Sequence, residues 1–190
     1  MVDCCVCKKT IGFFSRKVEL SQGEYCHKNC YFDSKQGKSY TLLVNARCLH
    51  INNQNSSALK EVDQALILTP DNMDLLALKA LVLRSLGKHR EALEYAEKAF
   101  TKFNKIYGNG FIVNQLKKTH SGKISQEWII KNHFLVDMYG DIIATISYGY
   151  SHIKKYAKAI PFLEEELKIY PNDESAMNNL VFCQKKSRSK

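Results

Sequence analysis

The chain has 190 residues, of which 45% are hydrophobic, so it is long enough for one ordinary domain with a packed core and a small additional module. It contains no apolar run of membrane-spanning length, and its first residues lead into Asp3 and a group of cysteines rather than into a basic and apolar leader. We therefore expect a cytoplasmic protein without membrane insertion. The net charge of +9 favours acidic partners, whether protein, nucleic acid or a membrane surface.

The cysteines are concentrated at the N-terminus. Five of the seven lie within residues 1–30, and this odd, uneven number favours a metal site over disulfide bonds. Two pairs have the two-residue spacing at which a tight turn directs two ligands to one ion: Cys4 with Cys7, and His27 with Cys30. Cys26 is an alternative to His27. Four protein ligands would leave no open position, so we expect one structural zinc ion rather than a catalytic one.

A β-hairpin is expected between the two ligand pairs. Residues 11–14 and 17–20 have strand composition, residues 21–24 contain a glycine turn, and a helix is expected from 28 to 35. This order resembles a treble-clef or zinc-ribbon module, and the ligand spacing is similar to the first half of a LIM domain. The second ligand set of a complete LIM domain is missing, so the resemblance implies a half-LIM module with one zinc ion over residues 1–38. Metal binding would supply the folding free energy of so small a module.

A redox Cys-x-x-Cys pair is the alternative interpretation of Cys4 and Cys7. The strand–helix–strand pattern of thioredoxin-like proteins does not surround this pair, and a second Cys/His pair has no role in that chemistry. The sequence therefore favours zinc.

From residue 39 onward the sequence has helical periodicity with a repeated pattern of small residues. Ala58 and Ala65 lie on a helical stripe that ends before Pro70, and the same pattern recurs about thirty-four residues later at Ala92 and Ala99. The segment 76–93, with a glycine turn between two helices, closely resembles a tetratricopeptide repeat (TPR). The resemblance implies a mainly α fold, a TPR-type α-solenoid of antiparallel helix pairs. An ordinary helical bundle is the alternative.

The repeats are expected at residues 39–72, 73–106, 107–139 and 140–173, followed by a terminal helix at 174–185 and a basic tail at 186–190. Residues 107–139 match the pattern poorly. They are assigned as a divergent repeat because Met73 and Gly140 are 67 residues apart, close to two repeat lengths.

A TPR array implies a concave groove that holds a peptide or protein partner, so we predict a non-enzymatic adaptor or scaffold for protein–protein interactions. The positions expected to face this groove are Tyr40, Arg47, Asp74, Leu78, Arg84, Tyr148 and His152. Apolar residues at 77, 78 and 81 argue against a clamp for a C-terminal carboxylate. No catalytic motif occurs, and the three glutamates at 164–166 are assigned to an exposed helix face.

Two other functions remain open at this point. The zinc module carries basic residues at 8, 9, 16, 17 and 28, so together with the basic tail it could bind nucleic acid. Alternatively, the zinc module covers the first end of the repeats and binds no partner.

Overall fold

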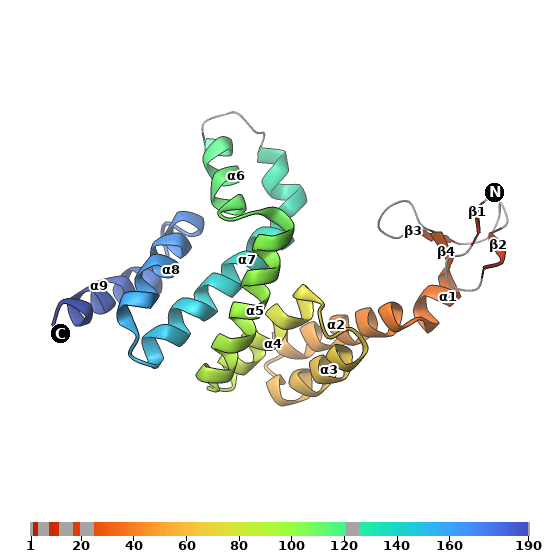
Figure 1. Cartoon of the computed structure of the whole chain (residues 1–190), viewed down its shortest axis with the longest axis horizontal. Coiled ribbons are helices and arrows are strands. Elements are labelled where there is room, and N and C mark those ends of the chain that lie inside the picture. The colour runs from red at the N-terminus through yellow and green to blue at the C-terminus, as the bar shows by residue number, and fades with distance from the viewer. Residues whose placement is uncertain (1, 4–7, 12–16, 20–24, 121–125, 190) are drawn as a thin grey trace. The chain divides into compact units, whose positions relative to one another are not determined.

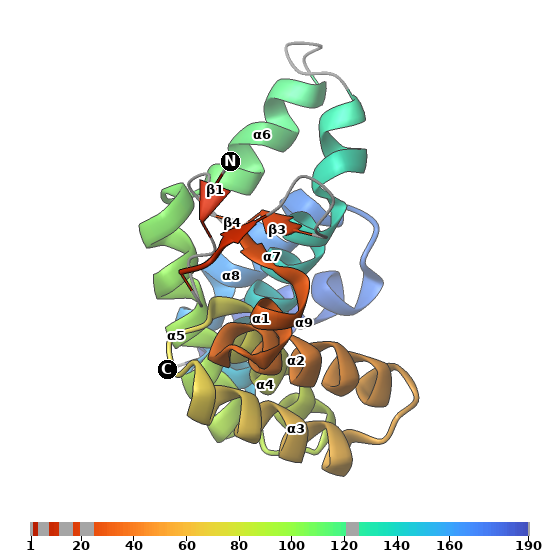
Figure 2. The ribbon, with the colours of Figure 1, turned by 90° about the vertical axis from the view of Figure 1, so that its right-hand side faces the viewer.

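The computed structural model describes residues 2–3, 8–11, 17–19, 25–120 and 126–189. These residues form nine helices and four short strands, so the described chain is nearly all helical (Figures 1 and 2). The chain divides into two compact units, residues 1–72 (unit 1) and 73–190 (unit 2). Among the described helices, none has the length and apolarity needed to cross a membrane.

Unit 1 begins with two short antiparallel strand pairs. β1 (Val2–Asp3) pairs with β2 (Thr10–Ile11), and β3 (Lys17–Glu19) pairs with β4 (Tyr25–His27). The sequence pattern predicts strands at 11–14 and 17–20 and none at 25–27. The structure differs, because strand 17–19 pairs with the segment that contains Cys26 and His27.

Helices α1 (Lys28–Asp33) and α2 (Lys35–Ile51) meet at a tight corner. Ser34 lies between them, and its Oγ accepts a hydrogen bond from the Gly37 amide (3.1 Å), which caps the N-terminus of α2. Gly37 is buried, and a Cβ at this position would lie 1.9 Å from the Tyr31 carbonyl oxygen. The sequence predicts a helix over residues 28–35 and the first repeat from residue 39. In the structure α1 ends at Asp33 and α2 already begins at Lys35, with the Ser34 cap between them.

Helices α2 and α3 (Asn55–Leu68) form the helix pair of unit 1. Their contact surface consists of small side chains, since Ala46 of α2 and Ala58 and Ala65 of α3 are fully buried. Small side chains let two helix axes approach closely. Helix α3 ends two residues before Pro70, where the sequence predicts its end.

Unit 2 begins with the helix pair α4 (Met73–Ser85) and α5 (His89–Tyr107). Gly87 has a φ of 74° and makes the turn between them, which requires the left-handed region that glycine reaches without strain. Ala80 of α4 and Ala92 of α5 are buried where the resemblance to a TPR requires small residues. This pair therefore has the packing predicted for segment 76–93.

A helical hairpin follows the first pair. Gly108 and Gly110 have positive φ and turn the chain into α6 (Phe111–His120), and α7 (Gln126–His152) comes next. Rings of Phe111 and Trp128 contact each other between these helices, with centroids 6.2 Å apart. Helix α7 has a non-helical residue at Asn132, and from there it continues without a break to His152.

Helix α5 packs directly on the second half of α7. Leu93 lies against Gly149, and the ring of Phe103 contacts the buried Tyr139 ring at 4.5 Å. The sequence predicts a divergent helix pair over residues 107–139, between these two helices. In the described structure α6 and the first half of α7 form a helical hairpin in this segment, and α5 packs directly on the second half of α7, so the hairpin does not separate the neighbouring helix pairs.

Helices α8 (Tyr156–Ile169) and α9 (Glu174–Arg188) complete unit 2. Ala159 and Leu163 of α8 form a buried cluster with Ala176 and Cys183 of α9. Asp173 Oδ1 accepts a hydrogen bond from the Ala176 amide (3.0 Å) and caps α9. Helix α4 pairs with α5, the second half of α7 pairs with α8, and α9 is the terminal helix. A pocket lies between α4, α7 and α9.

Candidate binding site

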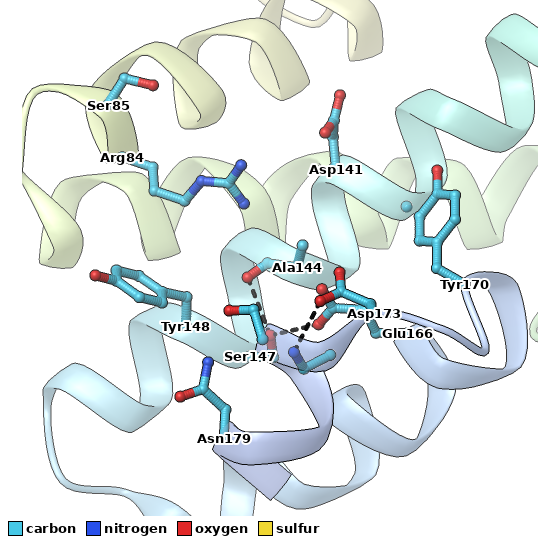
Figure 3. Close-up of a pocket in the computed structure, with 13 residues that line it drawn as sticks. Arg84, Ser85, Asp141, Ala144, Ser147, Tyr148, Glu166, Tyr170, Asp173 and Asn179 are labelled. Atoms are coloured by element: carbon cyan, nitrogen blue, oxygen red, sulfur yellow. Dashed lines mark hydrogen bonds between the residues drawn. The ribbon is translucent and has the colours of Figure 1, made fainter.

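A pocket of about 500 Å³ lies between α4, α7, α8 and α9 of unit 2 (Figure 3). Arg84 lies at the end of α4. The middle of α7 contributes Asp141, Ser147 and Tyr148, and Glu166 lies near the end of α8. Tyr170, Asp173 and Asn179 line the side formed by the α8–α9 connection and α9. The pocket therefore combines charged, hydroxyl and aromatic groups from four helices.

Glu166 is the most buried charged group of this pocket, with 7% of its surface exposed. Ser147 donates a hydrogen bond from Oγ to Glu166 Oε2 (3.0 Å), and the same hydroxyl lies 3.0 Å from the Ala144 carbonyl oxygen. A hydroxyl has a single proton, so an ionised Glu166 must share it with that carbonyl. Glu166 Oε1 accepts no hydrogen bond from any described residue.

Burial raises the pKa of Glu166, because a carboxylate loses its hydration inside the protein. The Ser147 hydrogen bond lowers this pKa, the nearby charge of Asp173 raises it, and the positive charge of Arg84 lowers it. The net direction is upward. A cation bound beside Oε1 would favour the ionised form of this carboxyl group.

Arg84 stands on the α4 side of the pocket. Its Nη1 donates a hydrogen bond to Thr145 Oγ1 (3.2 Å), and Thr145 is buried on α7. This bond holds the guanidinium beside the pocket instead of letting it extend into solvent, and Figure 3 shows it opposite Glu166. Arg84 is the one cationic side chain among the described lining residues.

Tyr170 forms the wall of the pocket opposite Tyr148 (Figure 3). Burial and the negative charges of Asp137 and Asp141 raise the pKa of Tyr170 to about 12, so the phenol stays protonated at neutral pH. Its Oη lies 3.5 Å from Asp137 Oδ1, at the outer limit of a hydrogen bond. Besides the tyrosines, the pocket is lined by one guanidinium, that of Arg84, and by three carboxyl groups, those of Asp141, Glu166 and Asp173.

Three stacked rings lie beside the Tyr148 side of the pocket. The ring of His152 contacts those of Tyr148 and His89, with centroids 4.4 Å and 3.9 Å apart. Burial, and then the neighbouring His152, lower the pKa of His89. His89 Nδ1 is buried and has no hydrogen-bond partner among the described residues, and the ring contacts those of His152 and Tyr148.

The predicted groove residues are distributed unevenly. Arg84 and Tyr148 line the pocket, and His152 stacks beside it. Asp74 lies at the other end of α4, where it lines a second cavity of about 350 Å³ together with Tyr107 and Phe134. Leu78 is 5% exposed, so this side chain packs in the interior instead of lining a groove.

The remaining predicted site residues belong to unit 1. Tyr40 and Arg47 lie on α2, and the Tyr40 side chain is exposed. Cys4 and Cys7 are outside the described residues, as are the side chains of Cys26 and His27, whose backbone lies in β4. Cys30 is half-buried on α1. In the described part of the chain, no three His, Cys, Asp or Glu side chains gather in a way that could hold a metal ion.

Glu166, the most buried charged residue of the pocket, is not among the residues predicted from sequence to form a site. The sequence pattern predicts an exposed face for residues 164–166, and only Glu164 is exposed. Glu165 is half-buried and accepts a hydrogen bond from Tyr139 Oη (2.6 Å), while Glu166 is buried. The signal was present, because Glu166 follows Ala159 and Leu163 at helical spacing and so lies on their buried stripe.

In its fold the chain is similar to the crystal structure of the Sgt2 TPR domain from Aspergillus fumigatus, with a TM-score of 0.50 and 17% sequence identity over 80% of each chain. This likeness confirms the predicted TPR-type helical fold. It gives no support to the half-LIM resemblance of residues 1–38. No protein-family model matches the chain. No curated protein matches its sequence.

Proposed function

We propose that this chain, with its TPR-type fold, is a non-enzymatic adaptor that holds a segment of a partner protein in the pocket of unit 2. The observation that carries the proposal is the pocket itself, which lies between the first helices of successive pairs. Its volume of about 500 Å³ is within the range of pockets that enclose a ligand and suits anchoring side chains of a peptide. Stacked helix pairs commonly bind peptides on this side of the array.

The pocket also has the chemical variety that peptide recognition needs. Tyr148 is 37% exposed and offers an aromatic surface at the rim, where tyrosine and arginine side chains often dominate binding energy. Arg84 and Glu166 supply opposite charges, and Asn179 supplies an amide. A partner segment lying between α4 and α9 would contact all of them.

The test selects peptides from a random-peptide phage library on the full-length chain, and then measures the affinity of the selected peptides by fluorescence anisotropy. Tyr148→Ala should weaken binding, whereas Lys168→Ala, an exposed change on α8 away from the lining residues, should leave it unchanged. A labelled oligonucleotide is measured in parallel over a range of salt concentrations. If no peptide is enriched, or if tight and steeply salt-dependent oligonucleotide binding is the one activity found, the adaptor proposal is wrong.

Residues 1–38 are proposed to form a second, zinc-dependent part of the adaptor. In support, β1 and β2 pair on either side of the segment that contains Cys4 and Cys7. Lys8, directly after Cys7, has a φ of 60°, a left-handed conformation of the kind found in tight turns. Strand β4 ends at His27, and α1 carries Cys30 in its first turn. Cys4, Cys7, His27 and Cys30 would hold the ion, with Cys26 as the alternative to His27.

The metal proposal is tested by elemental analysis of protein purified under reducing conditions. We expect about one zinc ion per chain, lost in Cys7→Ser. Loss in His27→Ala would assign the imidazole as a ligand, and loss in Cys26→Ser with retention in His27→Ala would assign the thiolate. Metal-free protein would show that the cysteines have another role, and the redox interpretation would then be examined with thiol titration.

A further inference from the structure

We propose that the pocket of unit 2 receives a lysine or arginine side chain of the partner segment, with Glu166 as the group that pairs with its charge. This inference rests on the proposed function and specifies the chemistry of the anchor residue. It concerns the side chain that enters the pocket, and the rest of the partner segment can carry any charge.

Glu166 has a carboxylate oxygen that is available to a ligand in the pocket. More than nine-tenths of this residue is buried, it lines the pocket, and one of its two oxygens has no hydrogen-bond partner in the described structure. Oε1 is not among the described buried atoms that lack a partner, so this oxygen is accessible from the pocket, and a donor or cation there would offset the hydration that the carboxylate loses on burial. A cationic donor from a ligand would fill this place.

The second argument is the local balance of charge. Asp141 and Asp173 line the pocket together with Glu166, and Arg84 is the one described cation opposite them. The Arg84 guanidinium is directed by its hydrogen bond to Thr145, and its charge is not sufficient to reverse the effect of burial on Glu166. Among the lining residues carboxyl groups thus outnumber cations, although the whole chain has a net charge of +9. A ligand side chain in the pocket interacts mainly with these nearby groups and less with the net charge of the chain, because salt screens the more distant lysines.

The third argument is the shape of a lysine or arginine side chain. Each has an apolar stem and a charged end, so the stem packs along apolar or aromatic surface while the end reaches a polar group. Tyr148 and Tyr170 stand on opposite sides of the pocket, with Glu166 between them in the view of Figure 3. Aromatic faces also attract cations directly. An acidic or amide side chain would gain neither interaction.

The experiment uses the full-length chain and three small probes: N-acetyl-lysinamide, N-acetyl-argininamide and the uncharged N-acetyl-norleucinamide. Two-dimensional NMR follows the backbone amides of Ala144, Ser147 and Ala176, which surround Glu166. The two cationic probes should shift these amides in a saturable manner and the uncharged probe should not. Equal shifts with all three probes, or none with any, would overturn the inference.

Two substitutions with opposite expected effects separate recognition from structural damage. Glu166→Gln should weaken binding of the cationic probe and of lysine- or arginine-containing library peptides roughly tenfold to a hundredfold. Arg84→Gln removes the repelling cation and should strengthen the same binding. General damage to the pocket would weaken both, so a parallel loss in the two variants contradicts the inference. Circular dichroism confirms that each variant is folded.

A proton measurement gives an independent readout. A bound cation favours the ionised form of Glu166, so binding should release protons, and affinity should rise with pH through the titration of this group. Calorimetry in two buffers of different ionisation enthalpy measures this release, which should vanish in Glu166→Gln. One outcome is that library peptides without basic residues bind, that Tyr148→Ala weakens their binding and that Glu166→Gln does not change it. The adaptor proposal would then be supported and the cationic anchor would be wrong. If no peptide is enriched while the cationic probes bind as described, the adaptor fails and the cation pocket remains.

Discussion

The ring of Tyr170 occupies the space that a side chain on Gly140 would need. A Cβ at residue 140 would lie 2.5 Å from Tyr170 Oη and 2.6 Å from Cε2, closer than such atoms approach. Gly140 is therefore a packing position inside α7, although the sequence analysis placed the start of a repeat there. The glycine lets the chain connecting α8 and α9 lie against the middle of α7, and this places Tyr170 at the wall of the pocket.

Gly140→Ala should displace the Tyr170 ring with little change in stability. The helix gains about 1 kcal/mol from replacing glycine by alanine, and the ring, which is partly exposed, can swing outward at a similar cost. Because the ring would leave the carboxylates of Asp137 and Asp141, the pKa of Tyr170 should fall from about 12 towards the ordinary value of 10. NMR of ¹³C-labelled tyrosine, with Tyr170→Phe for assignment, measures this. An unchanged titration would mean that the ring has not moved.

Gly149→Ala is the matched comparison, because it makes the same substitution on the same helix. Here a Cβ would lie 2.9 Å from Leu93 Cβ, an atom fixed to the α5 backbone, so the two helices must separate. Overpacking of this kind costs about 1–3 kcal/mol, which exceeds the gain in helix propensity. In urea denaturation Gly149→Ala should therefore be less stable than Gly140→Ala. The reverse order would contradict direct packing of α5 on α7.

Glu166→Gln should alter how stability depends on pH. The folded-state pKa of Glu166 is raised, so its contribution is fully present below the unfolded value of about 4.5 and is lost as pH rises through the folded value. Glutamine does not titrate, so the stability of Glu166→Gln relative to wild type should increase with pH over this window. Melting temperatures across the pH range measure the difference. Glu164→Gln, on the exposed side of the same helix, should show no such trend.

Substitution of His89 should change the pH dependence of stability in the opposite direction. Its folded-state pKa is lowered, so the stability that is present above the unfolded value of about 6.5 is lost as pH falls from there through the folded value. His89→Gln should remove this loss and gain on wild type as the solution is acidified below neutrality. His133→Gln, at an exposed position on α7, is the control. If the melting temperatures of wild type and His89→Gln differ by the same amount at every pH, the neighbouring rings do not hold the imidazole in its neutral form.

The regular part of the fold could be predicted from sequence because it depends on local patterns. Alanines at helical spacing, a proline after α3 and a glycine between α4 and α5 each act over one or two turns of chain. The hairpin of α6 and α7 is expected from sequence as a divergent helix pair, but its position outside the contact of α5 with α7 could not be predicted in this way. Its composition is also helical, and the contacts of Leu93 with Gly149 and of Phe103 with Tyr139 show that the hairpin lies outside the repeat packing.

Two of the positions predicted to face a groove line the pocket, and the other predicted positions do not. Arg84 and Tyr148 follow from their positions on the helices that border the pocket. Glu166 was missed because three consecutive charges suggest a solvated face, whereas the helix repeat turns one of the three inward. Leu78 was misplaced because the assumed groove stripe on α4 coincides with a buried one.

The hairpin between α5 and the second half of α7 has a consequence for how unit 2 folds. Hydrogen bonds between neighbouring helix pairs join residues 53 positions apart at Glu97 and Tyr150, and 61 apart at Arg84 and Thr145. In an array of uninterrupted repeats such partners are roughly one repeat apart, and structure spreads quickly from one repeat to the next. Closing the longer loop costs additional chain entropy before any contact compensates for it. We therefore expect α4–α5 and α7–α9 to acquire structure as separate segments, with their docking as the slow event.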